Sequence, residues 1–129
     1  MKKKIFILLV LFVSLVGFSP SALAANQENY DISVPAVGDV WSRNYLLNNG
    51  RLFETRLWAS GGKDIAMQIC RADTRAALGS TVTVHPSGAL TTLWRNNTGI
   101  DRWVVVRLNS VAGVFVTVRA QGTWFWNHL

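Results

Sequence analysis

Turn signals recur along this chain at short and nearly regular intervals, and this spacing limits the folds that the chain can adopt. Clusters of Gly, Pro, Asn and Ser lie at residues 35–38, 48–50, 60–63, 85–88, 96–101, 109–113 and at Gly122. Between them lie runs rich in Val, Leu, Ile, Thr and aromatic residues, which favour strands. Short strands at this spacing predict an all-β fold, an antiparallel sandwich of about eight or nine strands, with a small β-barrel as the alternative.

The predicted strands follow directly from the runs between the turns. They span residues 30–34, 39–47, 51–59, 64–71, 80–85, 89–95, 102–108, 113–120 and 123–127. Asn49-Gly50 is the strongest candidate for a hairpin turn, because both residue types tolerate the positive φ of a type I′ turn. Gly61-Gly62 is the next candidate. Residues 73–79 alone have the composition of a helical turn, and residues 25–29 are predicted to form a loose amino-terminal arm.

A secretory signal peptide is predicted over residues 1–24. A basic start precedes the apolar run 5–18, and the small residues Ala22 and Ala24 provide a cleavage site. The apolar run is shorter than the roughly 20 residues that a spanning helix needs, so we expect cleavage after Ala24 and no transmembrane anchor in the mature chain. Residues 25–129 then form one domain of a secreted, extracellular protein. The short basic start and the Ala-Leu-Ala site are typical of bacteria.

Trp and Arg are the residue types that distinguish the mature chain. Its formal net charge falls from +6 to +3 once the three lysines of the signal peptide are removed, and Lys63 is then its one lysine. The remaining basic residues are all Arg, which stacks on aromatic rings and binds carboxylates with two donors. All six Trp lie in the mature chain. The single cysteine, Cys70, excludes an internal disulfide and is expected to be a buried, inert thiol.

Period-two alternation places an aromatic residue and an Arg on the same face of four predicted strands. These sets are Trp41, Arg43 and Tyr45; Arg56 and Trp58; Trp103 and Arg107; and Phe115 and Arg119. One interpretation is structural, since Arg contacts with rings on neighbouring strands stabilise an exposed sheet face. The other is a binding face, on which rings stack on sugars and Arg orients their polar substituents. The candidate ligand-binding residues are Trp41, Arg43, Tyr45, Trp58, Trp103 and Arg107.

The carboxyl-terminal stretch QGTWFWNHL carries aromatic residues on both faces of a predicted strand. Alternation separates Trp124 and Trp126 from Phe125. Because a terminal strand is often an edge, Phe125 is predicted to enter the core, and the two Trp to line the outer face or cap the sandwich. For the stretch as a whole, closure of the core is favoured over a ligand platform. The predicted core residues of the preceding strand are Val114, Val116 and Val118.

Catalytic and metal-binding patterns are missing from the sequence, so an enzyme is not predicted. His85 sits in a turn, and His128 is next to last and expected to be mobile. One Cys and two scattered His do not make a zinc site, and no metal or other cofactor is predicted. Glu54 lies in the middle of a predicted strand, where an ion pair with Arg43 across the Asn49-Gly50 turn is expected.

These observations favour a small secreted, non-catalytic binding protein that recognises a cell-envelope or extracellular polysaccharide through a Trp/Arg sheet face. A secreted antimicrobial or membrane-active effector is the first alternative, because Trp, Arg and positive charge suit anionic membranes. A protein-interaction or inhibitor module is the second. Nucleic acid is not a predicted partner, since the net charge is modest for such a binder. The sequence leaves the oligomeric state open.

The layout of late strands after the Thr98-Gly99 turn resembles that of small secreted bacterial sandwiches of the pre-peptidase carboxyl-terminal type. The resemblance rests on the pattern of strands, without specific residues. It implies a sandwich fold, and it implies no function, because unrelated functions share such folds.

Overall fold

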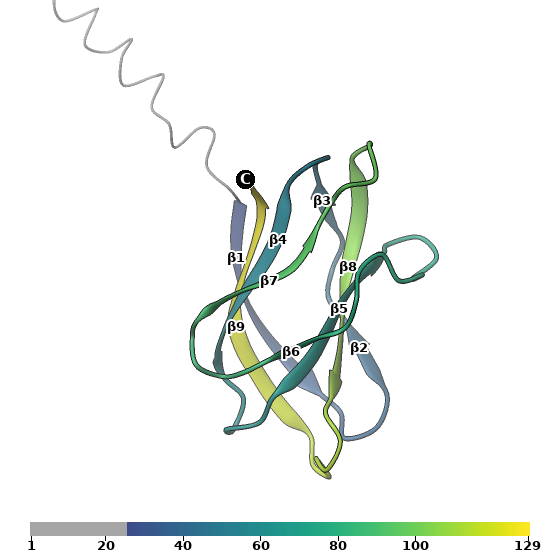
Figure 1. Ribbon diagram of the computed structural model, residues 1–129. Coiled ribbons are helices and arrows are strands. Elements are labelled where there is room, and N and C mark those ends of the chain that lie inside the picture. The colour runs from purple at the N-terminus through teal and green to yellow at the C-terminus, as the bar shows by residue number, and fades with distance from the viewer. Residues whose placement is uncertain (1–25) are drawn as a thin grey trace, which may run out of the picture.

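The computed structural model describes residues 26–129, so the predicted signal peptide over 1–24 lies outside the described residues. Every regular element of the described part is a β-strand (Figure 1). The strands are β1 (Asn26–Val34), β2 (Asp39–Trp41), β3 (Tyr45–Leu47), β4 (Leu52–Ala59), β5 (Ile65–Arg71), β6 (Val82–Val84), β7 (Leu90–Arg95), β8 (Arg102–Ser110) and β9 (Val118–His128). The predicted all-β fold class is confirmed.

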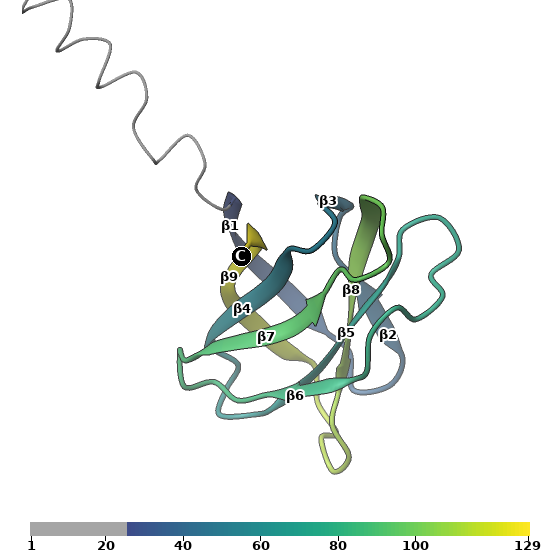
Figure 2. The same cartoon turned by 45° about the horizontal axis from the view of Figure 1, so that its top comes forward.

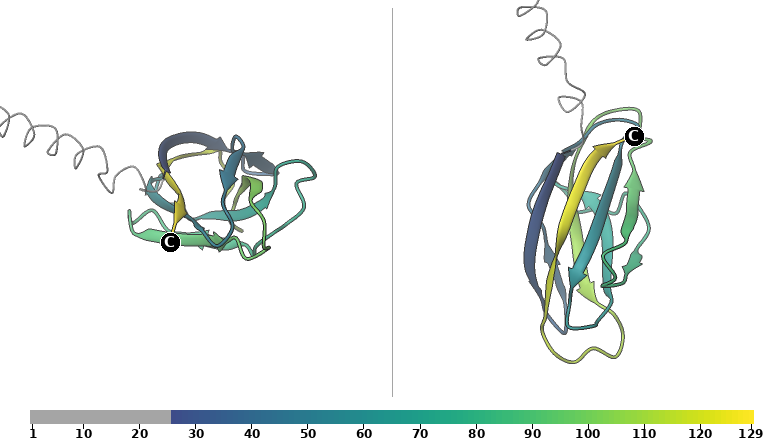
Figure 3. Two further views of the ribbon diagram at one scale, coloured as in Figure 1. Left: turned by 90° about the horizontal axis from the view of Figure 1, so that it is seen from above. Right: turned by 90° about the vertical axis from the view of Figure 1, so that its left-hand side faces the viewer.

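The strands form two antiparallel sheets, which we call sheet A and sheet B. Sheet A has the strand order β1-β9-β4-β7, whereas sheet B has the order β2-β8-β5-β6, with β3 also paired to β8. Figure 2 and Figure 3 show the two layers from further sides. Neither sheet closes on itself, so the structure is the predicted sandwich rather than the small barrel.

Most connections between consecutive strands cross from one sheet to the other. The Asn49-Gly50 turn joins β3 of sheet B to β4 of sheet A, so it is not the predicted hairpin. Gly61-Gly62 likewise joins β4 to β5 of the opposite sheet. The type I′ conformation predicted for Asn49-Gly50 is also wrong, because Gly50 has a positive φ and Asn49 does not. Gly61 and Gly62 both have positive φ. A glycine turn fixes the local chain reversal, whereas strand pairing depends on partners elsewhere in the sequence.

One long predicted strand is interrupted at residues 42–44. Trp41 in β2 pairs with Arg107 of β8, and Tyr45 in β3 pairs with Val104 of the same strand. From Trp41 to Tyr45 the β2–β3 segment advances four residues, whereas its partner β8 advances three, from Arg107 to Val104. The extra residue turns the side chains after the interruption to the opposite face of the sheet. Trp41 therefore lies on the outer face of sheet B, while Tyr45 points into the core. The prediction that the alternating aromatic residues of this segment share one face is wrong.

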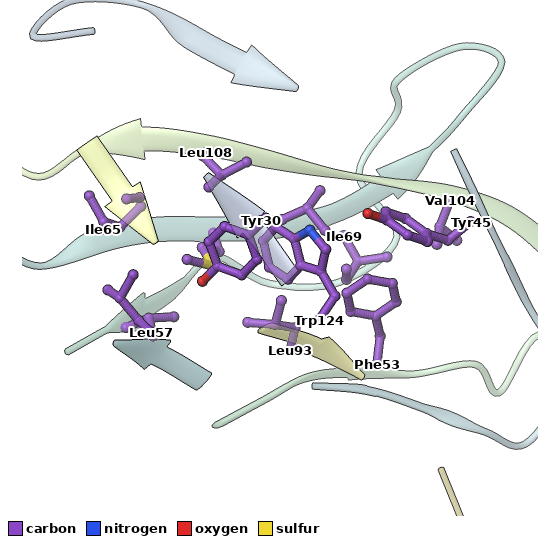
Figure 4. Close-up of a cluster of buried hydrophobic side chains, with 14 of the residues drawn as sticks. Tyr30, Tyr45, Phe53, Leu57, Ile65, Ile69, Leu93, Val104, Leu108 and Trp124 are labelled. Atoms are coloured by element: carbon purple, nitrogen blue, oxygen red, sulfur yellow. The ribbon is translucent and has the colours of Figure 1, made fainter. Parts of the chain in front are cut away.

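The core fills the space between the sheets with alternate side chains of the strands (Figure 4). Its largest fully buried side chain is Trp124, whose ring stacks on Tyr30 with 3.8 Å between the ring centres. Phe53 packs against Trp124, and Trp126 in turn packs against Phe53. The carboxyl-terminal stretch therefore closes the core, as predicted. The predicted faces are reversed, however, because the two Trp point inward and Phe125 lies on the outer face near Arg56.

Gly122 is a packing residue of β9 and not the predicted turn. It lies opposite Tyr30 in the pairing of β1 with β9. A Cβ atom at Gly122 would lie 2.2 Å from the carbonyl oxygen of Arg56 and 2.4 Å from the hydroxyl of Tyr30. Glycine thus allows the Tyr30 ring and β4 to approach the strand closely. Because β9 keeps its alternation through this point, Trp124 and Trp126 fall on the inner face.

The start of β9 differs from the prediction. β9 begins at Val118, so residues 111–117 form a loop between β8 and β9. Val118 is buried and Val114 packs against the core, as predicted, but Val116 is exposed. The alternation of this segment therefore does not extend into a strand.

Two further segments were assigned differently from the sequence. Residues 26–29 of the predicted loose arm belong to β1, and Asn26 pairs with Trp126 near the end of β9. The helical turn predicted over 73–79 is limited to one turn over residues 71–75, where the Arg75 N–H donates to the Arg71 carbonyl at 2.9 Å, and Ala77 makes an isolated bridge with Cys70. For residues 26–29, pairing with the distant β9 outweighs the local composition.

Both tyrosines of the chain are buried, and burial disfavours their charged phenolate form. Burial raises the pKa of Tyr30 to about 12, against which its hydrogen bond with Thr55 acts only weakly. The pKa of Tyr45 is also raised, by burial first and then by the negative charge of Glu28.

An alkaline titration followed by ultraviolet absorbance is expected to show no phenolate in the folded protein at pH about 10, where exposed tyrosine ionises. The folded state holds the protons of Tyr30 and Tyr45 to higher pH than the unfolded state does. The contribution of the two tyrosines to the free energy of unfolding is therefore fully present below pH about 10. It is lost as the pH rises through the folded pKa values. A quarter of the full phenolate signal at pH about 10 in the folded protein would mean that one ring is exposed, because an exposed tyrosine is half ionised at that pH.

Candidate functional site

The six candidate residues from the sequence do not form one surface. Trp41, Trp103 and Arg107 lie on the outer face of sheet B, whereas Trp58 lies on the outer face of sheet A. Tyr45 is a core residue, and Arg43 lies in the interruption between β2 and β3. The single Trp/Arg face expected from alternation is therefore divided between the two sides of the sandwich.

Arg43 links the segment between β2 and β3 to the neighbouring strand β1. Its guanidinium forms an ion pair with Glu28 of β1, and the Nε atom lies 2.9 Å from Glu28 Oε2. The guanidinium carbon lies 4.2 Å from the centre of the Tyr45 ring. Arg43 lowers the pKa of the Glu28 carboxyl through these hydrogen bonds. A shallow hollow of about 300 Å³ beside this ion pair is lined by Trp41, Arg43 and Tyr45, but its polar groups already bind one another.

Glu54 pairs with His128 and not with Arg43, so the predicted ion pair is wrong. Glu54 is buried, with Oε1 2.6 Å from His128 Nδ1 and Oε2 3.3 Å from the Thr92 hydroxyl. The His128 ring stacks on Phe125. His128 is accordingly held at the end of β9, contrary to the expectation that it is mobile. The strands that carry Glu54 and His128 are adjacent in sheet A, which sequence distance conceals.

Trp41 and Arg107 are engaged by neighbouring side chains on sheet B. Arg107 Nε lies 3.0 Å from Asp39 Oδ2, and another of its nitrogens donates to Gln68. The Arg75 guanidinium lies 4.6 Å from the centre of the Trp41 ring and covers one of its faces. Cys70 on the same face is buried, as predicted, and burial raises the pKa of its thiol. Trp41 and Arg107 therefore contribute to the stability of the sheet face through contacts with their neighbours.

Trp58 is exposed on sheet A, but its ring is fixed by the fold. Its Nε1 donates a hydrogen bond of 3.1 Å to the Thr123 hydroxyl, and a Cβ at Gly88 would lie 2.9 Å from the ring. Asn29 and Gln121 border the adjoining hollow of about 370 Å³. The ring therefore packs along the sheet.

Trp103 borders a hollow that is larger than those beside Arg43 and Trp58. Its side chain is 58% exposed. The hollow measures about 500 Å³, within the range of small-ligand sites. It is lined by Asn44, Arg71, Ala72, Asp73, Asp101, Arg102 and Trp103. We call it the Trp103 hollow.

The polar groups of the Trp103 hollow are positioned by the backbone turns around it. Arg71 donates two hydrogen bonds to the Asp73 carboxylate, at 3.1 and 2.9 Å. Arg71 lowers the pKa of Asp73, and the backbone N–H of Thr74 lowers it further. Asp101 accepts a hydrogen bond of 2.8 Å from the backbone of Asn49. Two carboxylates and two guanidiniums thus balance in charge beside an exposed ring.

Sequence reasoning identified Trp103 but missed the polar residues around it. Asp73 and Asp101 were assigned to turns by their residue type, which is correct for their local structure. Their convergence is a consequence of strand pairing, since Arg71 at the end of β5 lies opposite Val104 of β8. The turns before β8 and after β5 are brought together by this register. No local sequence pattern contains that information.

Comparisons with known proteins assign no family to the chain. No protein-family model matches it. No curated protein matches it either. Within residues 26–129, no group of three or more His, Cys, Asp or Glu side chains is arranged to hold a metal ion. In the same residues, no helix has the length and apolar character needed to cross a membrane.

Proposed function

We propose that the protein is a non-catalytic binding protein that recognises a cell-envelope or extracellular polysaccharide at the Trp103 hollow. The observation that carries this proposal is an exposed tryptophan ring beside a hollow lined by Asn, Asp and Arg. Flat rings pack on the apolar faces of sugars, and planar polar groups bind their hydroxyls. The proposal places the protein outside a bacterial cell, where the predicted signal peptide would direct it.

The proposed role of each residue in the hollow follows from the contacts of its side chain. Trp103 supplies the stacking surface. Asp101 and Asn44 supply acceptors and a donor at the rim, while Arg71 holds Asp73 in place. Because Asp73 is paired with Arg71 and has a lowered pKa, it is unsuited to act as a general acid. Binding without catalysis is the activity that this arrangement supports.

Replacing Trp103 by Ala is expected to lower the affinity for the bound polysaccharide about tenfold or more, because the stacking surface is lost. The measurement is co-sedimentation with peptidoglycan, chitin and cellulose at low and high salt. Binding of the unaltered protein should persist at high salt, since the hollow is balanced in charge. Trp58→Ala is the matched control, because Trp58 has nearly the same exposure, 56% against 58%, on the opposite sheet.

Unchanged binding in Trp103→Ala, or equal losses in Trp103→Ala and Trp58→Ala, would reject the Trp103 hollow as the site. Failure of the unaltered protein to bind any of the three polysaccharides would reject the ligand class. Binding that disappears at high salt would instead indicate attraction between net charges.

A further inference from the structure

The loops 35–38 and 111–117 lie side by side at one end of the sandwich, where the chain crosses between the sheets (Figure 1). Val34 pairs with Val118, so the first loop leaves sheet A where the second enters it. Asp39 pairs with Asn109, which places their other ends together in sheet B. A hydrogen bond of 2.9 Å from the hydroxyl of Ser110, the last residue of β8, to the Pro35 carbonyl joins the first loop to the strand end at which the second begins.

These loops are apolar, although loops on a protein surface are ordinarily polar. Their sequences are Pro-Ala-Val-Gly and Val-Ala-Gly-Val-Phe-Val-Thr, without a charged residue. Val37 is 90% exposed, Phe115 88% and Val116 62%. The turn at Gly113, with φ 88°, lets Val114 pack against the core and leaves Phe115 outside. We call Val37, Phe115 and Val116 the apolar tip.

The size of the apolar tip does not suit a stable protein interface. Such an interface buries about 800 Å² on each partner and involves some 20–30 residues a side. The two short loops supply far fewer residues, and their side chains project outward singly. A lipid bilayer accepts projecting apolar side chains without a matching shape, and affinity then follows the apolar area inserted.

The charges around the apolar tip are also those expected at a lipid surface. Arg119 is paired with Asp31, and Arg107 is paired with Asp39, so the strand ends next to the loops carry balanced charge. Lys63 is exposed on the turn between β4 and β5, at the same end of the sandwich. Such a lysine would attract phosphate headgroups while apolar side chains enter the bilayer, and the carboxylate of its neighbour Asp64 is paired with His85.

We propose that the apolar tip inserts into the outer layer of a phospholipid bilayer, with Lys63 at the headgroups. The Trp103 hollow lies at the opposite end of β8, near Arg102. Membrane docking therefore leaves the hollow accessible, and the proposal does not depend on what the hollow binds. The apolar insertion is the main attraction, and Lys63 adds to it only on anionic lipid.

The test measures partitioning of the full chain onto vesicles of phosphatidylcholine, with and without phosphatidylglycerol, at low and high salt. The double variant Phe115→Ser/Val116→Ser is expected to lower the partition coefficient about tenfold or more at either salt concentration. Lys63→Ser should weaken binding only to vesicles with phosphatidylglycerol at low salt. Ile100→Ser is the matched control, since Ile100 is 55% exposed at the opposite end of the sandwich and should partition as the unaltered protein does.

All variants share residues 1–25, so differences between variants belong to the substituted side chains. Equal partitioning of the double variant and the Ile100→Ser control would overturn the proposal, as would the absence of partitioning by the unaltered protein. Sedimentation equilibrium adds a separate readout. Self-association of the unaltered protein that the double variant abolishes would also overturn it, because the tip would then be a contact between copies of the chain.

Discussion

The variant Trp124→Ala is expected to lose about 3–5 kcal/mol of unfolding free energy, because it leaves a large cavity between the sheets. Trp124 is 1% exposed and stacks on Tyr30, with Phe53 on its other side. The free energy of unfolding of a domain of this size is about 5–15 kcal/mol in total, so the variant would be marginally folded at best. Urea unfolding followed by circular dichroism measures the loss without relying on tryptophan fluorescence.

Trp103→Ala is the matched control for this prediction. It removes the same side chain from an exposed position and should change the unfolding free energy by about 0.5 kcal/mol or less. Similar losses in Trp124→Ala and Trp103→Ala would contradict the assignment of one ring to the core and the other to the surface. The comparison also shows that Trp103→Ala is folded before its binding is measured.

The second large effect is expected for Gly122→Ala, which should lower the free energy of unfolding by about 3 kcal/mol or more. The added Cβ would lie 2.2 Å from the Arg56 carbonyl oxygen, which is fixed because β4 pairs with β9 at this point. It would also lie 2.4 Å from the hydroxyl of the buried Tyr30. For a domain of this size, such a loss lowers the midpoint of thermal unfolding by more than about 10 °C.

Gly113→Ala separates this crowding from a general cost of replacing glycine. No atom lies within 4 Å of a Cβ at Gly113, but its φ of +88° is strained for alanine. The expected cost is about 1 kcal/mol, from the backbone conformation alone. A smaller loss in Gly122→Ala than in Gly113→Ala would show that Tyr30 and β4 do not pack against the strand as described.

The sandwich was predictable because its strands are short and its turns are marked by Gly, Pro and Asn. Which side chains face the core was harder to predict, because a shift of one residue moves every later side chain of the strand to the opposite face. The interruption at 42–44 inverts Tyr45 relative to Trp41. The strand continues through Gly122, so the alternation that begins at the buried Val118 places Trp124 and Trp126 inside. The prediction ended the strand at Gly122 and therefore lost this alternation.

The candidate site was predictable only in its aromatic residue. Trp103 stands out because alternation separates it from the buried Val104. Its polar neighbours come from the segments around Asn44, Asp73 and Asp101, which meet only when β3 and β5 pair with opposite edges of β8. Because these pairings join residues far apart in the sequence, the meeting of the three segments is not encoded in neighbouring residues.

The most direct test of the proposed sugar-binding hollow is a nuclear magnetic resonance titration of the six indole N–H signals. Soluble chitin oligosaccharides and glycan fragments of peptidoglycan are the probes, and single Trp→Phe variants assign the signals. The Trp103 signal is predicted to shift with saturation, while those of Trp58 and the buried Trp124 stay in place. A saturable shift of Trp58 without Trp103, or no shift of Trp103 with either probe, would contradict sugar binding at the Trp103 hollow.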